Sequence, residues 1–237
     1  MKKIETERLL LRKVKLEDAQ AIFDNWASDE ETSRYVMWDK HVSLKETKNY
    51  VGKIVSNYKY DFYFDWLVCL KEDDEPIGEI SVVNFSLKQR ICEIGYCYGK
   101  KYWNKGYASE ALKAVIDYMF SETNIDKVYS RHLSNNEASG KVMKKAGMKY
   151  DGELENHAVD KLTGQRVSIK YYSIEKEKNY KTLCPVCGSY WFNENHEICP
   201  ICKWECDPVQ NKDENYEGGA NKLSLAKARK EYHEKEL

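Results

Sequence analysis

Apolar residues recur along the chain at two different spacings, which together predict its secondary structure. Leu112, Val115, Ile116 and Met119 lie three or four positions apart, so they share one face of a helix. The runs DWLVCL, IGEISVVNF and ICEIGYCY are short, rich in β-branched and aromatic residues and bounded by polar segments, which is typical of strands. Most of the chain is therefore expected to interleave helices with strands.

The expected elements follow one another without an internal repeat. Helices are expected over residues 17–27, from Ser43 to about residue 58, around Leu112 with an end at about residue 121, and from Asn136 to near Gly147. Strands are expected over residues 4–14, 65–70, 77–85, 91–98, 127–133, 148–156 and 167–175. We therefore predict an α/β (α+β) fold built around a mixed sheet with helices against it.

The composition changes near residue 177. Residues 175–181, EKEKNYK, are charged, and five of the eight cysteines follow within the last quarter of the chain. We predict a first domain over residues 1–176, a linker over residues 177–181 and a cysteine-rich module over residues 182–237.

Composition and charge exclude several classes of protein. A hydrophobic fraction of 42% with 12 Gly and 4 Pro excludes a collagen or a disordered chain. The 38 basic and 39 acidic residues argue against a broad grip on a nucleic-acid backbone. No stretch reaches the length of a membrane helix, and MKKIETERLL carries charges where a signal peptide needs apolar residues. We expect a cytoplasmic protein, in which clustered cysteines are metal ligands or redox groups rather than disulfides.

A candidate phosphate site lies between the strand at residues 91–98 and the helix that follows it. Gly106 and Ala108 are small, so they allow close approach to the helix N-terminus, where unpaired N–H groups and partial positive charge favour an anion. Lys100, Lys101 and Lys105 add positive charge. A glycine before a helix is common, so the spacing alone leaves a plain turn equally open.

The run EIGYCYGKKYWNKGYASEAL, followed by NNEASGKVMKKAGM, resembles the GNAT superfamily of acetyl-CoA-dependent N-acetyltransferases, and within it the ribosomal-protein N-terminal acetyltransferases. The resemblance covers about residues 4–176 and implies a mostly antiparallel sheet. It also implies that acetyl-CoA lies in a gap beside the strand at residues 91–98. The implied cofactor-binding residues are Tyr96, Cys97, Tyr98, Asn104, Lys105, Gly106, Tyr107, Ala108 and Asn136.

Acetyl transfer needs a group that accepts the proton of the amine and one that protonates the leaving thiolate. The resemblance implies Glu93 for the first role, although an exposed strand carboxylate is the alternative. Many members carry a tyrosine donor where this chain has Met143, so Ser139 is the preferred donor, and its alternative is a serine that only satisfies the first helical turn. Lys141, Lys144 and Lys145 either approach the 3′-phosphate of coenzyme A or form a solvated face.

The spacing of the clustered cysteines predicts a metal site. Cys184 and Cys187 form one Cys-x2-Cys turn, and Cys199 and Cys202 form another after eleven residues, so four thiolates are available to one tetrahedral zinc ion. Cys206 and His196 are extra candidates that we expect to be bystanders. CPVCG, CPICKW and GGANKLSLAKAR resemble zinc ribbons and the bacterial cysteine-rich CPCC family, which implies no known activity.

Two functions are open to this sequence. The first is an N-acetyltransferase that transfers the acetyl group of acetyl-CoA to a primary amine, either a protein N-terminus or a small molecule. The second is an interaction protein. Its zinc ribbon would bind a protein partner, and its first domain would bind coenzyme A without catalysis. Trp103, Asn104 and the missing tyrosine depart from the family pattern and favour this alternative. Nucleic-acid binding and a membrane location are not expected.

Overall fold

The computed structural model describes residues 1–176 and 182–235, and the predicted linker at residues 177–181 lies outside the described residues. The chain divides into two compact units, Met1–Lys176 and Glu177–Leu237. None of the helices in the described ranges is long and apolar enough to cross a membrane.

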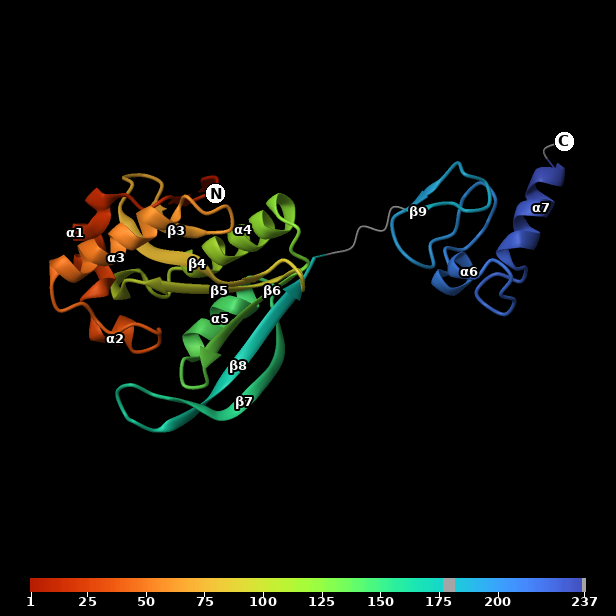
Figure 1. Ribbon diagram of the computed structural model, residues 1–237. Coiled ribbons are helices and arrows are strands. Elements are labelled where there is room, and N and C mark those ends of the chain that lie inside the picture. Colours follow the sequence, from red (N-terminus) through yellow and green to blue (C-terminus); the bar gives the residue numbers. More distant parts are fainter. Residues whose placement is uncertain (177–181, 236–237) are drawn as a thin grey trace. The chain divides into compact units, whose positions relative to one another are not determined.

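The first unit contains a single eight-stranded sheet (Figure 1). Its strands are β1 (Ile4–Glu5), β2 (Leu9–Arg12), β3 (Asp65–Leu70), β4 (Pro76–Ser86), β5 (Ile91–Tyr98), β6 (Lys127–Leu133), β7 (Lys149–Val159) and β8 (Arg166–Glu175). The strand order is β1-β2-β3-β4-β5-β6-β8-β7, and β5 with β6 is the parallel pair among antiparallel neighbours. The predicted mixed, mostly antiparallel sheet is confirmed.

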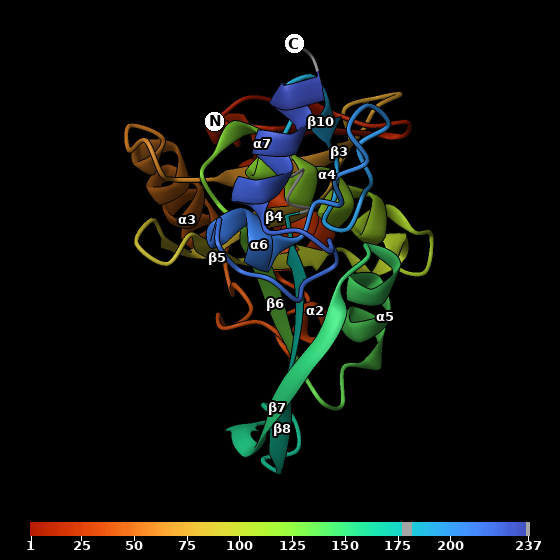
Figure 2. The ribbon, with the colours of Figure 1, turned by 90° about the vertical axis from the view of Figure 1, so that its right-hand side faces the viewer.

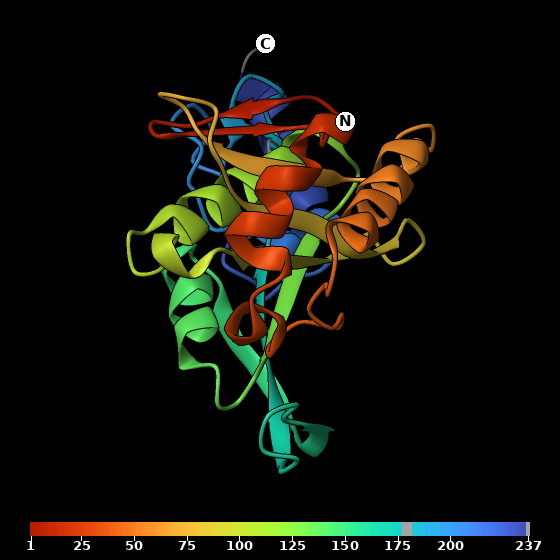
Figure 3. The same ribbon diagram turned by 90° about the vertical axis from the view of Figure 1, so that its left-hand side faces the viewer.

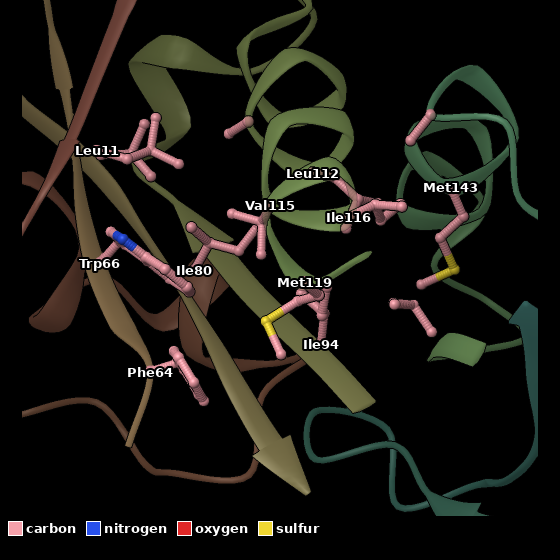
Figure 4. Packing of buried hydrophobic residues seen from close by; sticks show 14 of the residues in the cluster. Leu11, Phe64, Trp66, Ile80, Ile94, Leu112, Val115, Ile116, Met119 and Met143 are labelled. Carbon is pink, nitrogen blue, oxygen red and sulfur yellow. The ribbon is translucent and has the colours of Figure 1, made fainter. Parts of the chain in front are cut away.

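Helices lie on both faces of this sheet (Figure 3). The longer helices are α3 (Leu44–Asn57), α4 (Tyr107–Glu122) and α5 (Glu137–Lys145), and the short ones are α1 (Ala19–Ile22) and α2 (Glu30–Ser33). Residues of α4 and α5 pack in the same cluster as Trp66, Ile80 and Ile94 (Figure 4). Residues of α1 and α3 pack with Leu67 and Cys69 on the opposite face. We call these the α4 face and the α3 face.

The region predicted as one helix at residues 17–27 is divided. A 3-10 turn at Leu16–Asp18 precedes α1, and a π-helical turn at Phe23–Ala27 follows it. Asp18 is held by the guanidinium of Arg12 and accepts a hydrogen bond from the Lys15 N–H at 2.7 Å, so a tertiary ion pair fixes the first turn. The apolar spacing alone contains no signal for this contact.

The β7–β8 hairpin extends beyond the other strands (Figure 2), and hydrogen bonds connect its turn to the rest of the unit. The fully buried carboxylate of Asp160 accepts a hydrogen bond from Arg34 Nη2 at 2.8 Å and another from Asn135 Nδ2 at 2.5 Å. Burial raises the pKa of Asp160, but hydrogen bonds from Arg34, Thr163 and Asn135 outweigh it and hold that pKa below its ordinary value. The hairpin turn is therefore fixed to α2 and to the loop after β6.

The second unit has little regular structure and a small core of its own. It contains β9 (Thr182–Leu183) paired with β10 (Trp191–Phe192), α6 (Pro208–Lys212) and α7 (Leu225–Lys235). Phe192, Trp204 and Leu225 are buried together with Cys184 and Cys199, and Ala228 and Tyr232 pack against this cluster. The apolar face of α7 therefore covers the cysteine region of its own unit.

Prediction for the core of the first unit. Leu112 on α4 is fully buried, so Leu112→Ala removes apolar contacts and leaves a cavity. We expect the free energy of unfolding to fall by about 2–5 kcal/mol. Urea unfolding followed by tryptophan fluorescence measures the loss, with the exposed neighbour Lys113→Ala as control, expected within about 0.5 kcal/mol of wild type. A loss below about 1 kcal/mol for Leu112→Ala would contradict the packing of α4.

Candidate active site and metal site

The strands β5 and β6 part in the middle of the sheet. They pair in parallel only at Ile91–Lys127, Cys92–Val128 and Glu93–Tyr129, although β5 continues to Tyr98 and β6 to Leu133. On its other edge β5 stays paired with β4 as far as Tyr98. The second half of β5 therefore has one edge that the sheet leaves open.

The backbone direction along β5 decides which groups face this gap. The N–H of Gly99 donates to the carbonyl of Ile77 on β4, and hydrogen-bonded positions alternate in an antiparallel pair, so Cys97 also points toward β4. Tyr96 and Tyr98 consequently point their backbone groups toward the gap. The indole of Trp103 donates to the Tyr98 carbonyl at 2.6 Å. The open edge thus offers the N–H groups of Tyr96 and Tyr98 to an extended ligand.

The N-terminus of α4 lies at the end of this strand and of the loop that follows it. Gly106 has φ +85°, a left-handed conformation that favours glycine, and Asn104 has φ +61°. In the first turn of α4, the N–H groups of Tyr107 and Ala108 have no partner within the helix, as at any helix start. These residues are half-buried rather than covered. The geometry therefore fits an anion at the helix N-terminus.

The positive charge at this loop differs from the sequence prediction. Lys100 pairs with Glu31 at 2.7 Å and Lys101 with Glu75 at 2.8 Å, so both are neutralised by acidic partners. Lys105 lies over the Tyr102 ring.

Arg8 is a residue near this loop that sequence analysis did not single out. Its guanidinium binds Glu110 at 2.6 Å and the Lys105 carbonyl at 3.1 Å, and it lies 3.4 Å from where a Cβ on Gly106 would be. Its position about a hundred residues before the loop left no local signal in the sequence.

Glu93 lies at the point where the gap begins, on the α3 face. It is buried and paired with Arg131 Nε at 2.7 Å, and its Cα partner on β6 is Tyr129. The alternative interpretation of Glu93 as an exposed strand carboxylate is therefore wrong. The ion pair orients the carboxylate at the base of the gap.

Ser139 lies on the other face, in the first turn of α5. Its hydroxyl and the hydroxyl of Tyr96 are 2.8 Å apart, and Tyr96 also donates to the Ser139 carbonyl at 3.1 Å. Burial raises the pKa of the Tyr96 phenol, so this hydroxyl keeps its proton at neutral pH. Asn136 caps α5 by accepting the Ser139 N–H at 3.2 Å. The structure thus brings Tyr96, Asn136 and Ser139 together, while Glu93 lies across the sheet from them.

Two of the lysines on α5 line a surface pocket of about 200 Å³ with Lys170 and His132. The His132 ring is buried, and desolvation lowers its pKa, which the neighbouring lysines lower further. The pocket lies between α5 and β8, so Lys141 and Lys144 face away from the gap between β5 and β6.

Sequence analysis also missed two acids in apolar strands. Asp65 on β3 and Glu79 on β4 are buried on the α3 face. The sequence contains a single acid in each of the runs DWLVCL and IGEI. In an alternating strand such an acid is normally interpreted as facing the solvent.

The second unit brings the four predicted cysteines together. The sulfur atoms of Cys184, Cys187, Cys199 and Cys202 all lie within 4.8 Å of one another. Cys184 Sγ is 3.4 Å from Cys202 Sγ, and Cys187 Sγ is 3.6 Å from Cys199 Sγ. Sulfurs bound to one tetrahedral zinc ion at about 2.3 Å would be about 3.8 Å apart, so the set fits zinc.

The two extra candidates for the metal site have other partners. Cys206 accepts a hydrogen bond from Asn211 Nδ2 at 3.4 Å, and His196 lies 2.9 Å from Glu205. Neither residue belongs to the cluster of four sulfurs found among the described residues.

Comparison with known proteins agrees with both parts of this picture. Residues 8–149 match the family model of the acetyltransferase (GNAT) domain, and residues 182–235 match that of the cysteine-rich CPCC domain. The uncharacterized N-acetyltransferase p20 of Bacillus licheniformis is 28% identical over 178 residues, which cover 75% of this chain and 98% of that protein. The ribosomal protein uS5-alanine N-acetyltransferase of Escherichia coli (strain K12) is 26% identical over 162 residues, with 65% and 82% covered.

The fold has solved counterparts as well. RimL, a ribosomal L7/L12 alpha-N-protein acetyltransferase solved in complex with coenzyme A, matches with a TM-score of 0.66 at 18% identity, covering 73% of this chain and 98% of that one. The GNAT model itself spans more than half of the chain, from β2 to the start of β7. The chain therefore belongs to the GNAT acetyltransferases and carries a cysteine-rich CPCC domain after its acetyltransferase domain.

Proposed function

We propose that the domain at residues 1–176 transfers the acetyl group of acetyl-CoA to a primary amine, with acetyl-CoA bound in the gap between β5 and β6. The observation that carries this proposal is the parting of these strands beside the open N-terminus of α4. Acetyl-CoA is an extended ligand with an anionic pyrophosphate, so it can contact both the strand edge and the helix N-terminus. Its amides form hydrogen bonds with the edge of β5, and its pyrophosphate accepts hydrogen bonds from the N–H groups of residues 104–108. Lys105 adds positive charge there, whereas the charge of Arg8 is compensated by Glu110.

Glu93 is the proposed acceptor of the amine proton, directly or through a water molecule. Its carboxylate lies on the α3 face at the base of the gap and is oriented by Arg131. The neutral amine then attacks the thioester carbon, and the negative charge on the carbonyl oxygen is stabilised by an N–H group of the open edge of β5. The N–H groups of Tyr96 and Tyr98 point in the required direction.

Ser139 is the proposed donor to the leaving thiolate. The carbon–nitrogen bond forms, the carbon–sulfur bond breaks, and the thiolate takes a proton from the Ser139 hydroxyl, which lies 2.8 Å from the Tyr96 hydroxyl. After the products leave, Glu93 releases the proton of the amine and Ser139 regains a proton from solvent, so both groups return to their starting states. Met143 has no proton to donate, so Ser139 and Tyr96 supply the hydroxyl groups beside the leaving thiolate. The proton acceptor and the proton donor therefore act from opposite faces of the sheet.

The acceptor is an amine, and protein N-termini are one class that the ribosomal-protein acetyltransferases among the relatives suggest. Named N-acetyltransferases of similar sequence favour catalysis over an interaction protein that binds coenzyme A without reacting. We propose the cytoplasm as its compartment, because reduced thiols are kept there. A protein partner for the cysteine-rich module stays a prediction.

We propose that the module at residues 182–237 holds one structural zinc ion through Cys184, Cys187, Cys199 and Cys202. Four thiolates close a tetrahedral shell and leave no position for a substrate, so the role is structural. The small apolar core around Phe192 and Trp204 needs such support, since few residues are buried in this unit.

Prediction for acetyl-CoA binding. Gly106→Val places a branched side chain at a left-handed position beside the α4 N-terminus and 3.4 Å from Arg8, so acetyl-CoA affinity should fall more than tenfold. Isothermal titration calorimetry measures it. Gly152→Val is the matched control, because Gly152 also has positive φ but lies on β7 with open space around it. Equal affinities for Gly106→Val and wild type would contradict the placement of the pyrophosphate.

Prediction for the proton-transfer roles. Glu93→Gln and Ser139→Ala should each lower kcat by about 10²-fold, with little change in acetyl-CoA affinity, because each removes a group used in the transition state. Steady-state kinetics and calorimetry give the two quantities. The exposed substitutions Glu155→Gln and Ser121→Ala serve as controls. A Glu93→Gln enzyme with wild-type kcat and pH profile would mean that the amine loses its proton elsewhere.

Prediction for the metal. The purified, reduced chain should contain one zinc per molecule, and Cys199→Ser should lose it, whereas Cys206→Ser should retain it. Such a site contributes about 10 kcal/mol or more to folding, so chelation should unfold the second unit and leave the first folded. Metal analysis and circular dichroism test this. Less than half an equivalent of zinc, or a disulfide among these cysteines, would refute it.

A further inference from the structure

Two buried acids on the α3 face have no role in the mechanism above. Asp65 is 5% exposed and Glu79 is 7% exposed. Asp65 pairs with Ser81 across β3 and β4, and Glu79 pairs with Leu67, so the two acids are diagonal neighbours on one face of adjacent strands. Diagonal neighbours lie about 7–8 Å apart, within reach of a long side chain such as that of Glu79, and the charge of Glu79 acts on the pKa of Asp65. We call Asp65 and Glu79 the acid pair.

Each carboxyl group of the acid pair has one oxygen bound and one oxygen free. Tyr50 donates to Glu79 Oε1, and Tyr63 donates to Asp65 Oδ2 at 3.1 Å. Asp65 Oδ1 and Glu79 Oε2 are buried without any hydrogen-bond partner. Among the residues that the structure describes, no lysine, arginine or histidine forms an ion pair with either acid. Buried, unpaired carboxyl oxygens are costly, so this arrangement is suited to a cation that enters from outside.

The acid pair lies close to the acetyl-transfer site. Glu79 is directly opposite Cys97 on β5, next to Tyr96 and Tyr98, whose backbone groups face the gap. In the sheet, β4 is adjacent to β5 and β3 is the next strand beyond it. The backbone of β4 is therefore about 5 Å from β5, and that of β3 about 10 Å. Between the pair and the gap, Gly95 has no side chain, and the one side chain within 4 Å of where its Cβ would be is that of the exposed Val83, which is free to move aside. Gly95 and Ser81 are only half-buried. An acceptor amine held over β5 from the α3 face can therefore extend toward the pair.

We propose that the acid pair binds a second ammonium group of the acceptor, so that the preferred acceptors are aliphatic diamines or polyamines with about three to five carbon atoms between nitrogens. This inference rests on the proposed function, because the reacting nitrogen is the one in the gap. An ammonium group donates up to three hydrogen bonds, enough for both free oxygens. Its charge compensates the carboxylates at a site from which water is excluded.

The protonation of the acid pair fits this role. Burial raises the pKa of Glu79 to about 7, and burial together with the charge of Glu79 raises that of Asp65 well above its ordinary value. The titratable groups that face the pair are Tyr50 and Tyr58 from α3 and its end, Tyr63 before β3, and Cys97 on β5, and burial raises the pKa of each, so all four stay neutral. The empty pair therefore keeps a proton at neutral pH, and a bound ammonium releases it.

The experiment compares two acceptors of matched length with the full chain. For wild type, kcat/KM for 1,4-diaminobutane should exceed that for n-butylamine by about 10²-fold, since removing one partner of a buried charge pair costs a factor of this order. Asp65→Asn and Glu79→Gln should each reduce this ratio below about fivefold. Asp73→Asn, on the exposed turn between the same strands, makes the same charge change and should keep the wild-type ratio.

A binding readout without acetyl-CoA separates this inference from the proposed function. Millimolar 1,4-diaminobutane, but not n-butylamine, should raise the Tm of wild type by about 3 °C or more and leave that of the two acid-pair variants unchanged. This shift with no acetylation of any amine would refute the proposed function but support the cation site. Acetylation of both amines with a ratio near one, or a ratio that survives both substitutions, would overturn the inference and leave the proposed function intact. The acid pair would then share a proton and bind no cation.

Discussion

The separation of β5 from β6 is the constraint on which the first unit depends. Parallel pairing lasts for three residues and then stops, while β4 holds the other edge of β5 as far as Tyr98. The strand can leave one edge unpaired because the other edge and both faces hold it in place. As a result, the N–H groups of Tyr96 and Tyr98 face the gap, while the Tyr98 carbonyl is bound by the indole of Trp103. A ligand that satisfies them completes the sheet.

The two faces of the sheet differ in chemistry because different helices cover them. The α4 face is packed with apolar side chains such as Trp66, Ile80 and Ile94, and its polar groups at the gap are the hydroxyls of Tyr96 and Ser139. The α3 face carries the carboxyl groups of Glu93, Glu79 and Asp65, which lie on the three adjacent strands β5, β4 and β3. In the proposed mechanism, proton donation to the leaving group and binding of the amine therefore take place on opposite faces of the sheet.

The second unit solves a different problem, because it has few residues with which to build a core. Its buried cluster includes Cys184 and Cys199, two of the four residues whose sulfurs meet. Gln210, fully buried, donates to the carbonyls of Tyr216, Asn221 and Leu223 and so fixes the loop before α7. Packing and the proposed metal ligation therefore act at the same place, so we expect that loss of the metal unfolds the unit rather than loosening one loop.

The sequence by itself determined the features that depend on neighbours along the chain. Apolar spacing predicted the helix around Leu112 and the strands around it, small residues marked the start of α4, and paired Cys-x2-Cys turns predicted the sulfur cluster. Only the tertiary structure decided the features that depend on residues far apart. The ion pairs of Lys100 and Lys101, the approach of Arg8 to Gly106, and the meeting of Asp65 with Glu79 all join different elements. A strand pattern treats a single acid as an outward residue. Whether that acid meets water or another buried acid is set by the helix that packs over it.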